Sequence, residues 1–344
     1  MHISDFDYTL PPELIASEPV RPRHSSRMLV VDRSTGTFMD SAFRKIAEFL
    51  RAGDVLVIND TRVVKARLYG ALERATGTTR EIEILFVNPV AADAWEVLCK
   101  PGKRIREGDR VVFAAGVAVG TFGELRDEGL RVLRVNSDVM QLMENFGHVP
   151  LPPYIQRTDV PSDTTEYQTI FANEPGAIAA PTAGLHFTSE VFAELKQRNI
   201  ETVSLTLHVG VGTFLPVRTD DPADHRLRPE RFNLSAEAAE RLNSARAAGQ
   251  RIIAVGTTST RTLEYVMSKY GRFEAASGYA DTFILPGYQF RAVDGLLTNF
   301  HLPRSTLLML VCAFASRDLI YRAYEHAVRE RYRFYSFGDC MLLS

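Results

Sequence analysis

The sequence contains little cysteine and no long hydrophobic run, and each shortage excludes a class of protein. Three cysteines occur in 344 residues, and their scattered positions at 99, 312 and 340 give neither a disulfide framework nor a paired zinc-ligand motif. The longest apolar run, residues 307–315, is well short of the roughly 20 residues that span a bilayer. We therefore expect a cytoplasmic protein that makes no membrane contact.

A strong charge imbalance is also absent. The formal net charge is −2, so any contact with nucleic acid must use local basic clusters instead of a bulk positive field. Two such clusters lie at residues 100–110 and 329–333, although most clusters of this kind are solvated surface. The first 17 residues are acidic and polar and lack the basic-then-apolar order of a secretory signal.

The length of the chain, and a change in its residue pattern along the sequence, predict two domains. Residues 66–135 hold short apolar runs separated by Gly, Asp and Pro, which favours a small β-barrel or sandwich. A helix is expected over 137–147, and a proline-rich connector follows at 148–161. Beyond it, strands and helices alternate as in a layered α/β domain. The expected strands are 54–61, 201–209 and 251–256, and the expected helices are 188–198, 235–248, 257–270, 304–316 and 316–332.

Three histidines share an unusual local pattern. His186, His208 and His301 are each flanked by apolar residues and lie within a few residues of Gly or Pro. A strand followed by a glycine-rich turn lets backbone N–H groups approach a ligand closely. A lone histidine in such a setting is more often a core residue with satisfied ring nitrogens. Three with the same pattern make a shared pocket about as probable as a structural role.

The segment IAVGTTSTRT at 253–262 predicts a strand, a glycine and a cluster of hydroxyl residues that opens a helix. A helix N-terminus carries free N–H donors and partial positive charge, so this turn suits a carboxylate or phosphate. The alternative is a simple Thr/Ser helix cap. The glycine pair of GVGT at 210–213 lacks the remainder of a dinucleotide fingerprint, and zinc-type spacings such as HxH, HExxH and CxxC do not occur. We expect no metal.

Beyond these motifs, the whole chain resembles one family. PTAGLHF at 181–187, HVGVGTF at 208–214 and TNFHLPRST at 298–306 are its most specific matches, with INDTRVVKARL at 58–68 and YRFYSFGDCML at 332–342 in the same order. These segments are similar to the S-adenosylmethionine:tRNA ribosyltransferase-isomerases of queuosine biosynthesis. The resemblance implies a layered α/β domain formed by both chain ends (1–63 and 152–344) and an inserted all-β barrel domain (64–151).

The resemblance also implies an unusual reaction. S-adenosylmethionine serves as a ribosyl donor and not as a methyl donor. Its ribosyl moiety is transferred to 7-aminomethyl-7-deazaguanine at the wobble position of tRNAs with GUN anticodons and is isomerised. The products are epoxyqueuosine, adenine and methionine. A monomer without a metal is expected.

Site residues follow from the matched segments. We expect His186, His208 and His301 to be catalytic, because proton removal beside a sulfonium and protonation of adenine suit groups that titrate near neutral pH. Expected substrate-binding residues, including the wall where the two domains join, are Asp60, Thr61, Arg62, Thr182, Gly184, Gly210, Gly212, Thr213, Thr257, Thr258, Ser259, Arg261, Asn299 and Tyr335.

The chain departs from the family pattern at three positions. Arg228 stands where a second histidine is usual, Ala280 where threonine is common, and Lys65 where proline follows NDTRVV. These changes leave open a paralogue that acts on a different modified nucleoside or that binds tRNA without catalysis. A methyltransferase is disfavoured because the acidic glycine motif is missing.

Overall fold

The computed structural model describes residues 1–73, 79–155, 157–210, 212 and 219–344, which divide into two compact units. The first comprises Met1–Arg62, Pro153–Gln156 and Gln168–Ser344, and the second comprises Val63–Pro152 and Arg157–Tyr167. The sequence predicts a single return to the first unit at residue 152, whereas residues 157–167 group with the second unit. One contact that holds them there is Asp159, whose carboxylate accepts from the Val149 N–H at 3.2 Å and lies 3.1 Å from the His148 ring.

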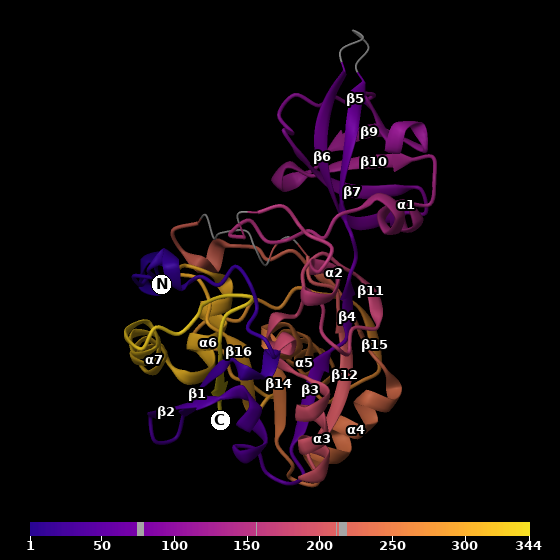
Figure 1. Ribbon diagram of the computed structural model, residues 1–344. Coiled ribbons are helices and arrows are strands. Elements are labelled where there is room, and N and C mark those ends of the chain that lie inside the picture. Colours follow the sequence, from indigo (N-terminus) through magenta and orange to yellow (C-terminus); the bar gives the residue numbers. More distant parts are fainter. Residues whose placement is uncertain (74–78, 156, 211, 213–218) are drawn as a thin grey trace. The chain divides into compact units, whose positions relative to one another are not determined.

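A nine-stranded mixed sheet forms the centre of the first unit, in the order β15-β13-β12-β3-β14-β16-β17-β1-β2 (Figure 1). Four neighbouring strands, β12, β3, β14 and β16, run parallel. Both chain ends contribute, because β1 pairs in parallel with the last strand, β17. The strands are β1 (Arg27–Asp32), β2 (Thr37–Ala42), β3 (Val55–Asn59), β12 (Glu201–Leu207), β13 (Glu230–Leu234), β14 (Ile252–Val255), β15 (Ala276–Ala280), β16 (Gly295–Asn299) and β17 (Cys340–Leu343). Two short strands, β4 (Thr61–Val63) and β11 (Glu174–Ala177), lie outside this sheet.

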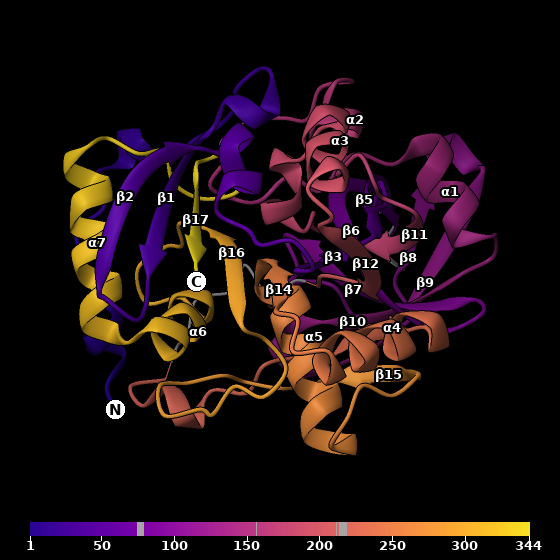
Figure 2. The same cartoon turned by 90° about the horizontal axis from the view of Figure 1, so that it is seen from below.

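Helices cover both faces of this sheet, so the predicted layered α/β domain is confirmed. Along β3, Val55 and Val57 enter the core beneath α4–α7, whereas Leu56 and Ile58 enter the core beneath α3, because successive side chains of a strand point to opposite faces. Figure 2 shows α4, α5 and α6 on one side of the strands and α3 on the other. The helical segments are η4 (Phe43–Glu48), η7 (Thr182–His186), α3 (Ser189–Gln197), α4 (Ala236–Ala247), α5 (Gly256–Tyr270), α6 (Thr306–Ala315) and α7 (Arg317–Arg329). Among the described residues, no helix is both long and apolar enough to cross a membrane.

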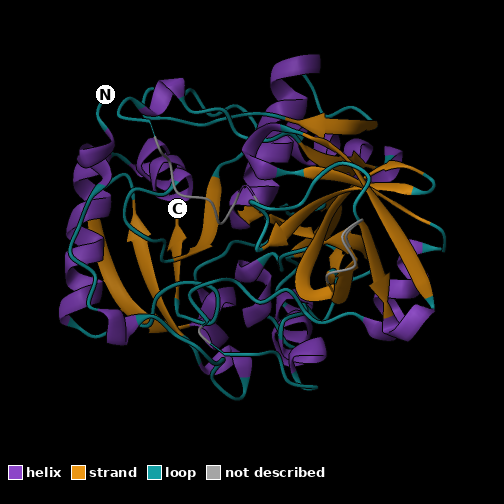
Figure 3. Ribbon diagram, turned by 90° about the horizontal axis from the view of Figure 1, so that it is seen from above, coloured by secondary structure: helices purple, strands orange, loops and turns teal. Residues whose placement is uncertain are grey.

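The second unit is a closed barrel of antiparallel strands in the order β10-β7-β6-β5-β8-β9, which confirms the predicted inserted all-β domain (Figure 3). Its strands are β5 (Arg67–Glu73), β6 (Thr79–Ala91), β7 (Ala94–Lys100), β8 (Arg110–Phe113), β9 (Ala118–Leu125) and β10 (Arg131–Val135). The predicted helix follows as α1 (Val139–Phe146), capped by Asp138, and a short α2 (Asp163–Glu166) lies further on. Val139, Leu142 and Met143 form its buried face, whereas Phe146, its last residue, is exposed.

The parallel strands place the sequence motifs at one edge of the sheet. β3 ends at Asn59, β12 leads into His208, β14 leads directly into α5, and β16 leads into His301. In open parallel sheets, ligands bind outside the carboxyl ends of the strands. The fold therefore directs the search for a site to this edge.

Gly147, in the barrel unit, is a glycine whose replacement the backbone cannot accommodate. A Cβ on Gly147 would lie 1.9 Å from the Lys65 carbonyl oxygen and 2.4 Å from that of Met143. We expect Gly147→Ala to lower the free energy of unfolding of the barrel by at least about 1–3 kcal/mol, the usual cost of overpacking. The matched control is Gly123→Ala, whose Cβ would meet its nearest neighbour at an ordinary 3.6 Å. Urea unfolding of both variants measures this, and equal stabilities would contradict the expectation.

Candidate active site

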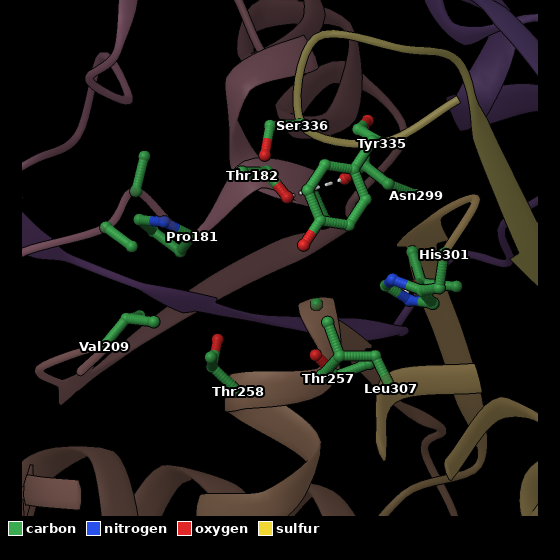
Figure 4. A pocket seen from close by; sticks show the side chains of 15 residues that line it. Pro181, Thr182, Val209, Thr257, Thr258, Asn299, His301, Leu307, Tyr335 and Ser336 are labelled. Carbon is green, nitrogen blue, oxygen red and sulfur yellow. Dashed lines mark hydrogen bonds between the residues drawn. The ribbon is translucent and has the colours of Figure 1, made fainter. Parts of the chain in front are cut away.

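A cavity opens at the carboxyl edge of the parallel strands in the first unit (Figure 4). Its empty space is about 530 Å³, a figure that includes the open mouth. No lysine, arginine, aspartate or glutamate is among its described lining residues. They are Ala179, Ala180, Pro181, Thr182, Ala183, Val209, Gly256, Thr257, Thr258, Thr298, Asn299, His301, Leu307, Tyr335 and Ser336.

The first turn of α5 forms one wall of the cavity through Thr257 and Thr258. No side chain caps this helix, and the first N–H groups of an α-helix have no partner within it. The hydroxyls of Ser259, Thr260 and Thr262 donate instead to carbonyls four residues earlier. Ser259 is therefore satisfied within the helix and does not line the cavity, whereas the uncapped helix end does.

His301 lines the cavity and is held from both sides. Its Nε2 lies 2.8 Å from the Thr298 hydroxyl. Tyr8 donates to its backbone carbonyl at 2.5 Å, and its backbone N–H donates to the Tyr324 hydroxyl at 3.0 Å. Burial lowers the pKa of the His301 imidazole to about 3. The ring is therefore neutral at physiological pH, and it does not titrate near neutral pH as the sequence led us to expect.

His186 lies behind the cavity wall and does not line it. Its Nδ1 is 2.8 Å from the Ser26 hydroxyl, and its Nε2 is 3.2 Å from the Asn299 amide nitrogen. Burial lowers its pKa to about 3, with a smaller contribution from the charges of Arg23 and Arg333. Both ring nitrogens are thus engaged, so His186 reaches the cavity only through Asn299.

The Asn299 side chain connects three segments that line the cavity. Its Oδ1 accepts from the Thr182 hydroxyl at 3.1 Å, and its Nδ2 lies 3.2 Å from both the His186 ring and the Tyr335 carbonyl oxygen. The ring of Tyr335 projects among the labelled side chains of Figure 4. Tyr335 has a φ of 74°, in the left-handed region that bulky residues rarely adopt. Burial raises the pKa of its phenol to about 12, so the hydroxyl stays protonated.

His208 lines a different and more open hollow. Its Nδ1 lies 2.8 Å from the Thr61 hydroxyl, and burial with the nearby Arg231 charge lowers its pKa to about 4. Asp60 lines the same hollow, accepts from the Thr206 hydroxyl at 2.7 Å and has its pKa raised by burial. The neighbouring Val209 lines the main cavity instead. The structure therefore does not bring the three histidines into one cavity.

The other expected site residues separate into several groups. Gly184 is a packing position, since a Cβ there would lie 2.7 Å from the Phe171 ring. Arg62 is exposed, and Thr213 lies outside the described residues. Three of the expected residues belong to a smaller second cavity that shares Leu307 with the first: Gly212 and Arg261 line it, and the Gly210 N–H donates to a third lining residue, Glu230.

Sequence reasoning missed Thr298, Ser336 and Glu230, which line the two cavities. A signal for Glu230 was present, because the alternation in ERFNL at 230–234 places it on the same face as Phe232 and Leu234. Within the described part of the chain, no group of three or more His, Cys, Asp or Glu side chains is placed to hold a metal ion. Within the basic cluster at 329–333, Tyr332 is fully buried, and the Arg27 guanidinium lies over its ring.

The depressed pKa of the two fully buried histidines predicts a pH-dependent stability. Because their folded pKa of about 3 lies below the unfolded value of 6.5, the unfolded chain binds more protons between these pH values, and stability falls as pH drops below 6.5. At pH 5 we expect each histidine to have removed about 2 kcal/mol relative to pH 7.5. Urea unfolding at both pH values should show a smaller loss in His186→Asn than in the natural sequence. An unchanged loss would contradict this assignment.

Comparison with known proteins identifies the family of the chain. The model of the queuosine biosynthesis protein family matches residues 3–343. Curated relatives named S-adenosylmethionine:tRNA ribosyltransferase-isomerase are 50% identical in Symbiobacterium thermophilum and 48% identical in Desulfitobacterium hafniense, each over 100% of both chains. A crystal structure of S-adenosylmethionine tRNA ribosyltransferase from Thermotoga maritima is 35% identical, with a TM-score of 0.57 over 99% of this chain and 100% of that one.

These matches cover both units, at identities where family membership is unambiguous, and they agree with the motifs that line the cavity. The relatives are named as transferases, and this chain is an enzyme of the same class. The chain belongs to the queuosine biosynthesis protein family.

Proposed function

We propose that the enzyme transfers the ribosyl moiety of S-adenosylmethionine to 7-aminomethyl-7-deazaguanine at the tRNA wobble position and isomerises it. The products are epoxyqueuosine, adenine and methionine. The observation that carries this proposal is the uncharged cavity beside the open N-terminus of α5, which a neutral histidine also lines. We further propose tRNAs with GUN anticodons as the substrates, the cytoplasm as the compartment, a monomer as the active form and no metal.

The cavity suits a sulfonium donor for electrostatic reasons. Lysine or arginine in the lining would repel the sulfonium, and the described lining residues include neither. The sulfonium acidifies the adjacent C5′ hydrogens, so a base can generate an ylide that opens the sugar and expels adenine. N–H groups at the start of α5 are preorganised donors for negative charge that develops during this step. The amine of the RNA is the nucleophile, so no Ser or Cys nucleophile is needed.

The proposed roles follow the geometry of the residues. His301 lines the cavity and is the proposed proton-transfer group, whereas His186 is a positioning residue that acts through Asn299. Thr257 and Thr258 hold the donor, and the Tyr335 ring faces adenine. His208 lines the second hollow with Asp60 and is proposed to act only if that hollow belongs to the active site.

The first test follows adenine release. Purified enzyme is mixed with S-adenosylmethionine and an anticodon stem-loop that carries 7-aminomethyl-7-deazaguanine. We expect adenine and methionine in equal amounts, together with the mass gain of a cyclopentane adduct on the RNA. S-adenosylhomocysteine would indicate methyl transfer, and no product with the donor still bound would indicate a non-catalytic paralogue.

The two histidine positions give a sharper test. We expect His301→Gln to lower kcat for adenine release by about 10²- to 10⁴-fold, the usual contribution of general acid–base catalysis. His208→Gln should lower it far less if only the main cavity carries the chemistry. His326→Gln on α7, where the ring contacts the Asp40 carboxylate, is the matched control and should leave kcat unchanged. If His301→Gln retains kcat within about twofold, the proposed role of His301 is wrong.

A further inference from the structure

The smaller cavity beside the main one contains a buried ion pair with an unused hydrogen-bond donor. Arg261 Nη1 lies 2.6 Å from Glu230 Oε2, and both side chains are only 6% exposed. Glu230 Oε1 accepts from the Gly210 N–H at 2.9 Å, and Arg261 Nε donates to the Thr282 carbonyl at 3.0 Å. The remaining nitrogen, Arg261 Nη2, is buried and has no hydrogen-bond partner in the described structure.

An unpaired buried guanidinium nitrogen is costly, so it requires an explanation. The cavity around it has an empty space of about 360 Å³ including its mouth, and Phe283, Leu307 and Leu310 supply apolar walls. Arg228 lines the same cavity. This combination suits a ligand group with a carboxylate, a nearby cation for Glu230 and a short apolar stem.

The position of Arg261 connects this cavity to the proposed reaction centre. Arg261 follows Thr258 by three residues on α5, which corresponds to a rise of about 4.5 Å along the helix. Thr258 lines the main cavity, and Leu307 lines both. Four bonds separate a sulfonium sulfur from the carboxyl carbon of its methionine arm, a span of about 5 Å at ordinary bond lengths. The methionine arm of the donor is therefore long enough to reach from the start of α5 to Arg261.

We propose that the smaller cavity binds the α-amino-acid end of the sulfonium donor, with the carboxylate on Arg261 Nη2 and the α-ammonium on Glu230. This inference rests on the proposed function and adds the part of the site that selects an intact amino acid. The N-terminus of α5 is the competing carboxylate site, but it offers only about half a charge, whereas Arg261 offers a full charge and a desolvated donor. The start of α5 is then left for the reacting sugar.

The test compares two ligands that differ only in the carboxylate. Calorimetry measures the affinity of the natural enzyme and of Arg261→Met for S-adenosylmethionine and for decarboxylated S-adenosylmethionine. We expect the natural enzyme to prefer the carboxylated ligand by about 10- to 100-fold, since a charged hydrogen bond contributes about 1.5–3 kcal/mol. In Arg261→Met the preference should fall to about threefold or less, because methionine keeps the side-chain bulk but removes the donor.

The control is another arginine in a carboxylate pair. Arg251 donates to Asp54 at 3.0 and 2.5 Å where β14 and β3 begin, far along the strands from the cavity edge, so Arg251→Met should keep the full preference. If Arg261→Met does not fold, Arg261→Lys keeps the charge without the planar fork and should give an intermediate preference. An unchanged preference in a folded Arg261 variant overturns the inference and leaves the proposed function standing. If the natural enzyme binds neither ligand, the proposed function fails and the inference fails with it.

Discussion

The hydrogen bonds of one buried amide, that of Asn299, hold the candidate site together. Asn299 ends β16, yet its side chain meets Thr182 of η7, the His186 ring and the Tyr335 carbonyl. A buried amide left without a hydrogen-bond partner destabilises the fold by its uncompensated desolvation free energy. The three segments are therefore constrained to the arrangement that keeps these bonds. The left-handed backbone of Tyr335, which costs on the order of 1–3 kcal/mol, persists because its carbonyl and N–H are both held by the residues around β16.

The same burial that orders the site also sets its electrostatics. His186 and His301 are neutral because a charged imidazole would lose its hydration, and the described lining of the main cavity carries no ionised side chain. Charge is concentrated one helical turn further along α5, where Arg261 meets Glu230. In the proposed function, the two cavities would bind different parts of the zwitterionic, sulfonium-bearing donor. The main cavity would surround the reacting centre without competing charge, and the smaller one would offer charges that match the amino-acid end.

Local patterns in the sequence predict much of this arrangement, but not its long-range parts. The apolar segments 54–61 and 251–256 and the alternation after residue 188 predict the parallel strands, and the short runs at 66–135 predict the barrel. The pairing of β1 with β17 joins residues more than 300 positions apart, and nothing in the local sequence of either strand specifies its partner. Only the resemblance to a family predicts that both chain ends share one domain. Local sequence is equally unable to predict which cavity a histidine side chain enters. His208 and Val209 are neighbours in one glycine-rich segment, yet they face different cavities, and one residue of register decides which of them lines the main cavity.

The hydroxyl cluster of α5 left two roles open in the sequence, a helix end with free N–H donors and a simple helix cap. In a cap, a Ser or Thr oxygen accepts from the first free N–H groups. In the structure the hydroxyls of Ser259, Thr260 and Thr262 donate backwards to carbonyls, and the preceding residue, Val255, offers no side-chain acceptor. The first turns of this helix are buried on all sides, and this pattern gives each of these hydroxyls a hydrogen-bond partner. It does so without using the free backbone N–H groups at the helix N-terminus. A conventional cap would fill those donors with protein oxygen. The back-bonded hydroxyls keep them open, and this is the condition under which a helix end can serve a substrate.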